Sequence, residues 1–208
     1  MQDNTKLKLI LGSASPRRKE LLSFYKLPFD IDVPDVDESS NILDPKVYVQ
    51  EIALRKARAI AERHDSFNGV IICSDTTVSF EGQILGKPLD IARARAHLKL
   101  LSGNTHQVFT ALALVKCVHG VKEYFCDVAQ TQVEFLSIPD ALLEDYLATG
   151  DSLDKAGSYG IQGAAQIFVK SIQGSYSNVV GFPLHLFYEM MSHKLFPGPK
   201  ESSWLSLF

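Results

Sequence analysis

Residues 7–19, LKLILGSASPRRK, join a strand-like segment directly to the start of a helix. Leucine recurs at every second position from Leu7 to Leu11, which is the period of a β-strand, and Gly12 ends the segment. Ser15 followed by Pro16 is typical of a helix start, since serine caps the first turn and proline fits the first helical position. The stretch therefore predicts a strand followed by a helix, which is the unit of α/β sheets.

Further along the chain, this alternation gives way to long strands. Asp44-Pro45 is a second helix start, and residues 70–73 form a short apolar run of the kind found in a strand covered on both faces. We expect further elements over residues 29–33 (strand), 44–63 (helix), 76–85 (hairpin), 90–101 (helix), 108–118 and 121–136 (strands), 139–150 (helix), 167–172 (strand) and 183–194 (helix). The combination predicts an elongated, mixed α/β sheet and not a purely parallel, doubly wound one.

The composition limits the kinds of partner. The chain has 208 residues and a formal net charge of -3, which argues against a broad nucleic-acid or membrane-binding surface but permits a small anionic ligand. No apolar run is long enough for a transmembrane helix, and the polar first residues do not predict a secretory signal, so we expect a cytoplasmic protein. We expect one domain over residues 1–196, with residues 197–208 as a tail that either docks through Trp204 and Phe208 or hangs free. Three widely spaced cysteines are expected to be free thiols.

The helix start at residues 13–19 carries three cations in its first turn. The N-terminus of a helix already presents unpaired N–H groups and the positive end of the helix dipole, so acidic side chains belong there. A bound anion would resolve the conflict, because N–H groups, the Ser13 hydroxyl and the guanidinium groups of Arg17 and Arg18 would converge on phosphate oxygens. The alternative is that both arginines point into water or pair with acids elsewhere.

Carboxylates follow two of the expected strands. Asp75 comes directly after the apolar run at 70–73, where ligand sites of open α/β sheets lie, and an Asp there can bind Mg²⁺ or act as a base toward water. Glu38 belongs to a run of acidic residues at 35–38, after the strand expected at 29–33. Taken alone, Asp75 could merely cap a turn and the acidic run could be a solvated loop.

Two lysines and one glutamine complete the set of candidates. Lys56 lies beside the apolar stripe of its helix, where the alternative is a lysine that only extends to solvent. Lys87 lies in a Gly-Lys-Pro turn that lacks the spacing of a phosphate-binding P-loop. Gln162 belongs to a polar, glycine-rich loop at 153–163, whose glycines permit close approach to a ligand and whose amide can read the edge of a base.

Six motifs along the chain occur in the order found in the Maf family of nucleoside-triphosphate pyrophosphatases, which the sequence therefore resembles from Leu9 to about Met191. They are SASPRR (13–18), SDT (74–76), GKP (86–88), LSGNTH (101–106), DKAGSYGIQG (154–163) and VVGFPL (179–184). The resemblance implies an elongated, two-lobed mixed-sheet fold like that of inosine triphosphate pyrophosphatases, with a central cleft. It also implies cleavage of a nucleoside triphosphate to the monophosphate and pyrophosphate, assisted by Mg²⁺ or Mn²⁺.

The resemblance also assigns roles to catalytic residues. Asp75 matches the proton acceptor that prepares water, and Glu38 matches a carboxylate that shares the metal with Asp75. Lys56 and Lys87 match the catalytic, phosphate-facing lysines. Cys73 and the long tail depart from the family's usual pattern.

Substrate-binding roles follow in the same way. Ser13 and Arg18 match the phosphate-binding turn between strand and helix. Arg17, Thr76 and Gln162 match the specificity positions of the branch that acts on dTTP and UTP. A sister branch that prefers 7-methyl-GTP carries Trp at the position of Arg17.

Two other functions remain open on the sequence. One is a nucleotide-binding regulator of septum formation and cell division that does not turn its ligand over, and the other is an inosine or xanthosine triphosphate pyrophosphatase. Modified pyrimidine nucleotides are also candidate substrates. The family resemblance further suggests a homodimer, and we expect neither nucleic acid nor a membrane as a partner.

Overall fold

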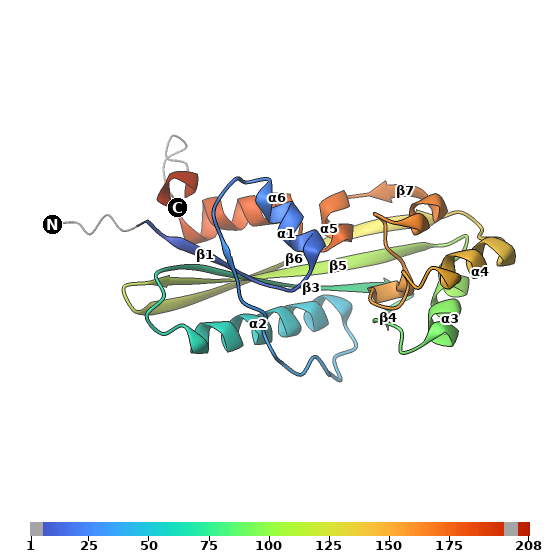
Figure 1. Cartoon of the computed structure of the whole chain (residues 1–208), viewed down its shortest axis with the longest axis horizontal. Helices are drawn as coiled ribbons and strands as arrows, with labels where there is room; N and C mark the ends of the chain where they lie inside the picture. The colour runs from blue at the N-terminus through green and yellow to red at the C-terminus, as the bar shows by residue number, and fades with distance from the viewer. Residues whose placement is uncertain (1–5, 198–203) are drawn as a thin grey trace.

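The computed structural model describes residues 6–197 and 204–208, which are built around one seven-stranded sheet (Figure 1). The strands follow the order β2-β1-β3-β5-β6-β7, and β4 pairs with β3 outside this path. Their bounds are β1 Lys8–Gly12, β2 Asp30–Ile31, β3 Gly69–Phe80, β4 Gln83–Leu85, β5 Thr105–Val118, β6 Val121–Phe135 and β7 Val169–Gln173. The pairs of β1 with β2 and with β3 are parallel, whereas the other pairs are antiparallel. The predicted mixed sheet is confirmed.

Strand β3 is longer than the sequence pattern indicated. The expected strand at 70–73 and the first arm of the expected hairpin form one strand of 12 residues, whose pairing with β5 runs from Gly69 to Ser79. The turn at Glu81-Gly82 leads back into β4, as predicted. Because β3, β5 and β6 are all long, the molecule extends along the strand direction, as Figure 1 shows.

Helices cover both faces of the sheet. They are α1 Pro16–Ser23, α2 Pro45–Arg63, α3 Ile91–Leu101, α4 Asp140–Ala148, α5 Tyr176–Val180 and α6 Leu184–Glu189. Helix α2 lies on one face, and α1 and α6 lie on the other (Figure 1). Accordingly, Ile71 and Cys73 of β3 share a buried cluster with α2, whereas Val70 and Ile72 belong to the larger cluster on the opposite face. A strand covered on both faces is what the apolar run at 70–73 predicted.

Both predicted helix starts are present. The Ser15 hydroxyl accepts a hydrogen bond from the Arg18 N–H at 3.5 Å, and α1 begins at Pro16. The Asp44 carboxylate accepts hydrogen bonds from two N–H groups at 2.8 and 3.0 Å, and α2 begins at Pro45. The helix expected over 183–194 is less regular, because α6 ends at Glu189 and residues Met190–Leu195 continue with π-helical geometry.

The last residues dock on the larger cluster. Trp204 and Phe208 are both buried, and the Trp204 ring lies 5.7 Å from that of Phe187 and 5.8 Å from that of Tyr25. The Trp204 indole N–H donates to the hydroxyl of Ser192 at 2.9 Å. Of the two alternatives for the tail, docking through these rings is therefore the one observed; residues 198–203 of the tail, and the polar residues 1–5, lie outside the described residues.

Three further expectations concern the chain as a whole. Cys73, Cys117 and Cys126 are free thiols, as predicted. Within the described residues, no helix is long and apolar enough to cross a membrane. The division into a two-lobed domain over residues 1–196 and a tail stays a prediction.

Candidate active site

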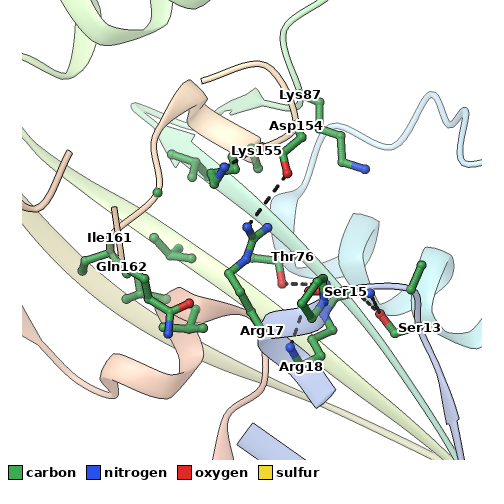
Figure 2. Close-up of a pocket in the computed structure, with 18 of the residues that line it drawn as sticks. Ser13, Ser15, Arg17, Arg18, Thr76, Lys87, Asp154, Lys155, Ile161 and Gln162 are labelled. Atoms are coloured by element: carbon green, nitrogen blue, oxygen red, sulfur yellow. Dashed lines mark hydrogen bonds and ion pairs between the residues drawn. The ribbon is translucent and has the colours of Figure 1, made fainter. Parts of the chain in front are cut away.

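A cavity of about 650 Å³ opens where the β1–α1 turn, strands β3 and β5 and the glycine-rich loop meet (Figure 2). Eight of the nine predicted site residues line it: Ser13, Arg17, Arg18, Glu38, Lys56, Thr76, Lys87 and Gln162. The ninth, Asp75, is buried next to it and is reached through Lys56. The fold thus gathers residues that are spread over most of the sequence.

Arg18 points into the protein and ties three segments together. Its Nε donates to the carbonyl of Gly181 at 3.0 Å, and its Nη2 donates to the Thr76 hydroxyl at 3.1 Å. Its Nη1 lies 3.4 Å from the hydroxyl of Ser13. Burial lowers the pKa of Arg18, although the negative charge of Asp75 opposes that shift. Arg18 is therefore a positive charge fixed at the wall of the cavity, as an anion site requires.

Lys56 lies between the two predicted metal ligands. Its Nζ is 2.7 Å from Oδ1 of Asp75 and 2.9 Å from Oε1 of Glu38, and only 10% of its side chain is exposed. The alternative of a lysine that merely extends to solvent is thereby excluded. The three side chains come from α2, from β3 and from the loop after β2, so tertiary structure alone brings them together.

The two carboxylates of this cluster differ in their electrostatics. Burial raises the pKa of Asp75, and the charge of Glu38 acts in the same direction, against the attraction of Lys56 and Arg18. The pKa of half-buried Glu38 is lowered overall. Burial raises this pKa, but the hydrogen bond and charge of Lys56, together with the charges of Lys87 and Arg18, outweigh that effect. Burial thus makes the Asp75 carboxylate a stronger base than an exposed aspartate.

The acidic run around Glu38 is folded by its own neighbours. Asp37 accepts hydrogen bonds from the N–H and the hydroxyl of Ser39 at 2.8 and 2.6 Å, and Arg55 of α2 donates to the carbonyl of Asp37. These contacts leave Glu38 as the carboxylate of the run that lines the cavity. Asp37 therefore behaves as part of a solvated loop, whereas Glu38 lines the cavity and pairs with Lys56.

The chemistry of Glu38 and Asp75 fits a divalent cation only in part. Mg²⁺ is typically held by one or two protein carboxylates together with substrate phosphates, and these two carboxylates meet that requirement. No group of three or more His, Cys, Asp and Glu side chains suited to a metal occurs within the described ranges. A cation here would depend on oxygen atoms from the substrate.

The glycine-rich loop contributes side chains that sequence reasoning did not select. Asp151, Asp154 and Lys155 line the cavity, and an oxygen of Asp154 lies 3.9 Å from a guanidinium nitrogen of Arg17. Asp154 and Lys155 open the motif DKAGSYGIQG, so the motif itself was the available signal. Gln162, farther along the loop, is exposed.

Two buried histidines hold this loop from behind. His97 of α3 lies 2.8 Å from the hydroxyl of Ser158, and His106 of β5 lies 2.8 Å from the hydroxyl of Tyr159. Burial lowers the pKa of His106 to about 4, so this imidazole is neutral at pH 7. Both histidines therefore support the structure of the loop.

Comparison with known proteins gives consistent matches. The profile of the Maf-like protein family matches residues 8–194. A dTTP/UTP pyrophosphatase of Bacillus cytotoxicus is 44% identical over 178 residues, covering 85% of this chain and 90% of the relative. A dTTP/UTP pyrophosphatase of Symbiobacterium thermophilum is 43% identical over 190 residues, covering 91% and 95%.

Among solved structures, a nucleoside-triphosphatase (dITP/XTP pyrophosphatase) of Mycobacterium abscessus is 19% identical, with a TM-score of 0.41 over 64% of this chain and 76% of that one. The family match rests on the sequence, since the profile spans the sheet, its covering helices and every residue that lines the cavity. The chain belongs to the Maf family.

Proposed function

We propose that this protein is a nucleoside triphosphate pyrophosphatase that hydrolyses dTTP and UTP to the monophosphate and pyrophosphate. The observation that carries the proposal is the arrangement of the cavity: the cluster of Lys56, Glu38 and Asp75 and the loop that carries Gln162 border one space. A triphosphate and a base can therefore be bound at the same time. The relatives with over 40% identity carry this activity in their names.

The triphosphate is proposed to bind the β1–α1 turn and the lysines. Ser13 and the Arg17 N–H form an anion site at the N-terminus of α1, where Pro16 has no N–H and Ser15 accepts from the Arg18 N–H, and the guanidinium group of Arg18 adds a fixed positive charge. Lys87, which is exposed at the edge of the cavity, is placed to reach phosphate oxygens. Together these groups would offset the charge that accumulates on the phosphate oxygens during hydrolysis.

Asp75 is proposed to accept the proton of the attacking water. The water oxygen forms a bond to the α-phosphorus, the bond from that phosphorus to the bridging oxygen breaks, and pyrophosphate leaves. The proton passes to Asp75, whose pKa is raised by burial, so it is a stronger base than an exposed aspartate. Lys56, held by Asp75 and Glu38, fixes the orientation of that carboxylate.

Glu38 and Asp75 are also proposed to hold the divalent cation, Mg²⁺ or Mn²⁺, together with the substrate. When bound, the cation neutralises phosphate charge and makes pyrophosphate a better leaving group. The single charge of Lys56 already offsets one of the two negative charges of these carboxylates, which is consistent with a cation that enters with the triphosphate.

Base recognition is proposed for Arg17, Thr76 and Gln162. The exposed amide of Gln162 can donate and accept hydrogen bonds at the edge of a pyrimidine. The hydroxyl of Thr76 lies 3.0 Å from that of Thr110 and accepts a hydrogen bond from Arg18, so it contributes to the wall of the cavity. In Figure 2, Gln162 and Ser13 lie on opposite sides of Arg17.

Pyrophosphate release with Mg²⁺ tests the proposal. The panel comprises dTTP, UTP, CTP, ITP, 7-methyl-GTP and modified pyrimidine triphosphates, and dTTP and UTP are expected to be turned over fastest. Faster turnover of ITP than of UTP would favour the inosine or xanthosine activity. Tight binding of UTP without turnover would favour a regulator of septum formation.

We further propose a cytoplasmic homodimer. Three free cysteines fit a reducing compartment, and the dimer rests on the family resemblance alone. Light scattering on the purified protein measures the oligomer, and a monomeric mass at micromolar concentration contradicts it.

A further inference from the structure

Lys155 lines the cavity proposed to bind the triphosphate, yet its ammonium group is fully occupied. Nζ donates to the carbonyl and to Oδ1 of Asp151, both at 2.8 Å, and to Oδ1 of Asp154 at 2.5 Å. An ammonium group has three hydrogens, so no donor remains for a phosphate. Only 12% of the side chain is exposed. Lys155 therefore organises its surroundings instead of binding the substrate's charge.

The partner Asp151 holds the backbone around Gln162. Oδ2 of Asp151 accepts a hydrogen bond from the Tyr146 hydroxyl at 3.3 Å, and that hydroxyl accepts one from the N–H of Gly160 at 3.3 Å. A Cβ on Gly160 would lie 2.7 Å from Cε of Lys155, and one on Gly163 would lie 2.8 Å from Oδ2 of Asp151. The two glycines that flank the segment of Gln162 thus contact the Lys155–Asp151 pair directly.

The other partner, Asp154, forms an ion pair with Arg17, which is drawn as a dashed line in Figure 2. The two charged groups are 3.9 Å apart, and 67% of the Asp154 side chain is exposed. An exposed pair of this kind contributes little to stability, so a substrate group can replace Asp154 as the partner of Arg17. Before the substrate binds, the pair holds the guanidinium group near the loop.

We propose that Lys155 is a positioning residue for base recognition: by holding Asp151 and Asp154 together, it sets Gln162 and Arg17 at a fixed separation on the two walls of the cavity. The inference rests on the proposed function, which gives Gln162 and Arg17 contact with the base. Fixing both groups in advance lowers the entropy lost on binding and makes the site selective for one base edge.

A direct phosphate contact by Lys155 makes a different prediction. Every nucleoside triphosphate carries the same phosphates, so loss of such a contact would weaken UTP and CTP equally. Loss of a positioning residue weakens only the substrate whose base is read. UTP and CTP differ at the base edge alone, and their ratio of kcat/KM therefore separates the two roles.

The test is steady-state pyrophosphate release by full-length Lys155→Met with UTP and CTP. We expect KM for UTP to rise roughly 10- to 100-fold with a much smaller change in kcat, because misplacement of binding groups by about 1 Å has effects of this size. kcat/KM for CTP stays close to that of the wild type, so the ratio of kcat/KM for UTP to that for CTP falls. Lys155→Arg restores part of it, since a guanidinium group also donates to two carboxylates.

Lys170→Met is the matched control, because Lys170 forms a 2.8 Å ion pair with Glu134 away from the cavity. It is expected to leave KM and the UTP/CTP ratio unchanged. Equal losses for UTP and CTP in Lys155→Met, or no change in either, would overturn the inference. If the wild type releases no pyrophosphate from UTP, the proposed function fails first, and the inference fails with it.

A second variant decides the matter if Lys155→Met does not fold. Asp154→Asn alters an exposed loop residue, and we expect a smaller rise in KM for UTP. In an Arg17→Met protein, adding Asp154→Asn should not raise KM for UTP further, because Arg17, the partner of Asp154, is already absent. Additive losses in this cycle would contradict the link from Lys155 through Asp154 to Arg17.

Discussion

Two lysines of this protein each lie between two carboxylates, but only one of them has a donor left for a ligand. Lys56 contacts Glu38 and Asp75 at 2.9 and 2.7 Å, and Lys155 contacts Asp151 and Asp154 at 2.8 and 2.5 Å. Lys155 uses its third hydrogen on the carbonyl of Asp151. Lys56 has no such third contact within residues 6–197 and 204–208.

The two clusters also differ in their origin. The partners of Lys155 lie within four residues of it, so a single loop forms the cluster. The partners of Lys56 come from a loop and a strand on other parts of the chain. The comparison teaches that the same set of charges can leave a donor free beside the cavity in one place and hold a loop in another, depending on which hydrogen bonds are already made.

Removing the base of the Lys56 cluster should have the largest effect. We expect Asp75→Asn to lower kcat roughly 10²- to 10⁴-fold, the usual contribution of a general base, with an unchanged melting temperature. Asp65→Asn is the control, because Asp65 pairs with Lys122 outside the cavity. Wild-type turnover in a stable Asp75→Asn protein would remove Asp75 from the reaction.

Acid should weaken the support that His106 gives to the glycine-rich loop. An unfolded histidine takes up a proton near pH 6.5, whereas folded His106 resists protonation until about pH 4. Lowering the pH through this window therefore favours the unfolded state, by up to about 3 kcal/mol at pH 4. Above pH 6.5 the contribution is complete.

Urea denaturation at pH 7, 6 and 5 measures this effect. In His106→Gln, the free energy of unfolding should fall less between pH 7 and pH 5 than it does in the wild type. His185→Gln, at an exposed site, should show the same pH dependence as the wild type. Identical slopes for wild type and His106→Gln would contradict the assignment.

Removing Lys56 should expose the cation-binding capacity of its two partners. In nucleotide-free Lys56→Met, we expect Mn²⁺ to bind at least about tenfold more tightly than in the wild type, since a charge at 4 Å is worth about 4 kcal/mol at an effective dielectric constant of 20. Electron paramagnetic resonance of free Mn²⁺ gives the affinity. Lys194→Met, which breaks an ion pair with Asp127, serves as the control. Unchanged affinity would show that Lys56 does not compete with the cation.

The smallest effect is expected from crowding the Lys155 cluster without changing its charge. Gly160→Ala places a Cβ against Lys155, which must shift. We expect a few-fold rise in KM for UTP, an unchanged kcat and a nearly unchanged melting temperature. A fall in kcat with constant KM would mean that this loop contacts the reacting phosphates.

Local features of the fold were accessible from the sequence because they depend on neighbouring residues. Ser15-Pro16 and Asp44-Pro45 start their helices as predicted, since capping involves groups within one turn. The apolar run at 70–73 indicated correctly that β3 is covered on both faces. The five-residue helix α5 was missed, because so short a segment carries too little periodicity to be recognised.

The sequence by itself determined the mixed α/β class, the family and most of the candidate site residues. Only the tertiary structure decided how those residues are placed: Arg18 points inward, and Asp75 lies behind Lys56. The physical reason is that residue type and spacing fix which charges are present, whereas burial and hydrogen-bond partners depend on distances between segments far apart in the chain. Those distances arise only when the sheet brings the segments together.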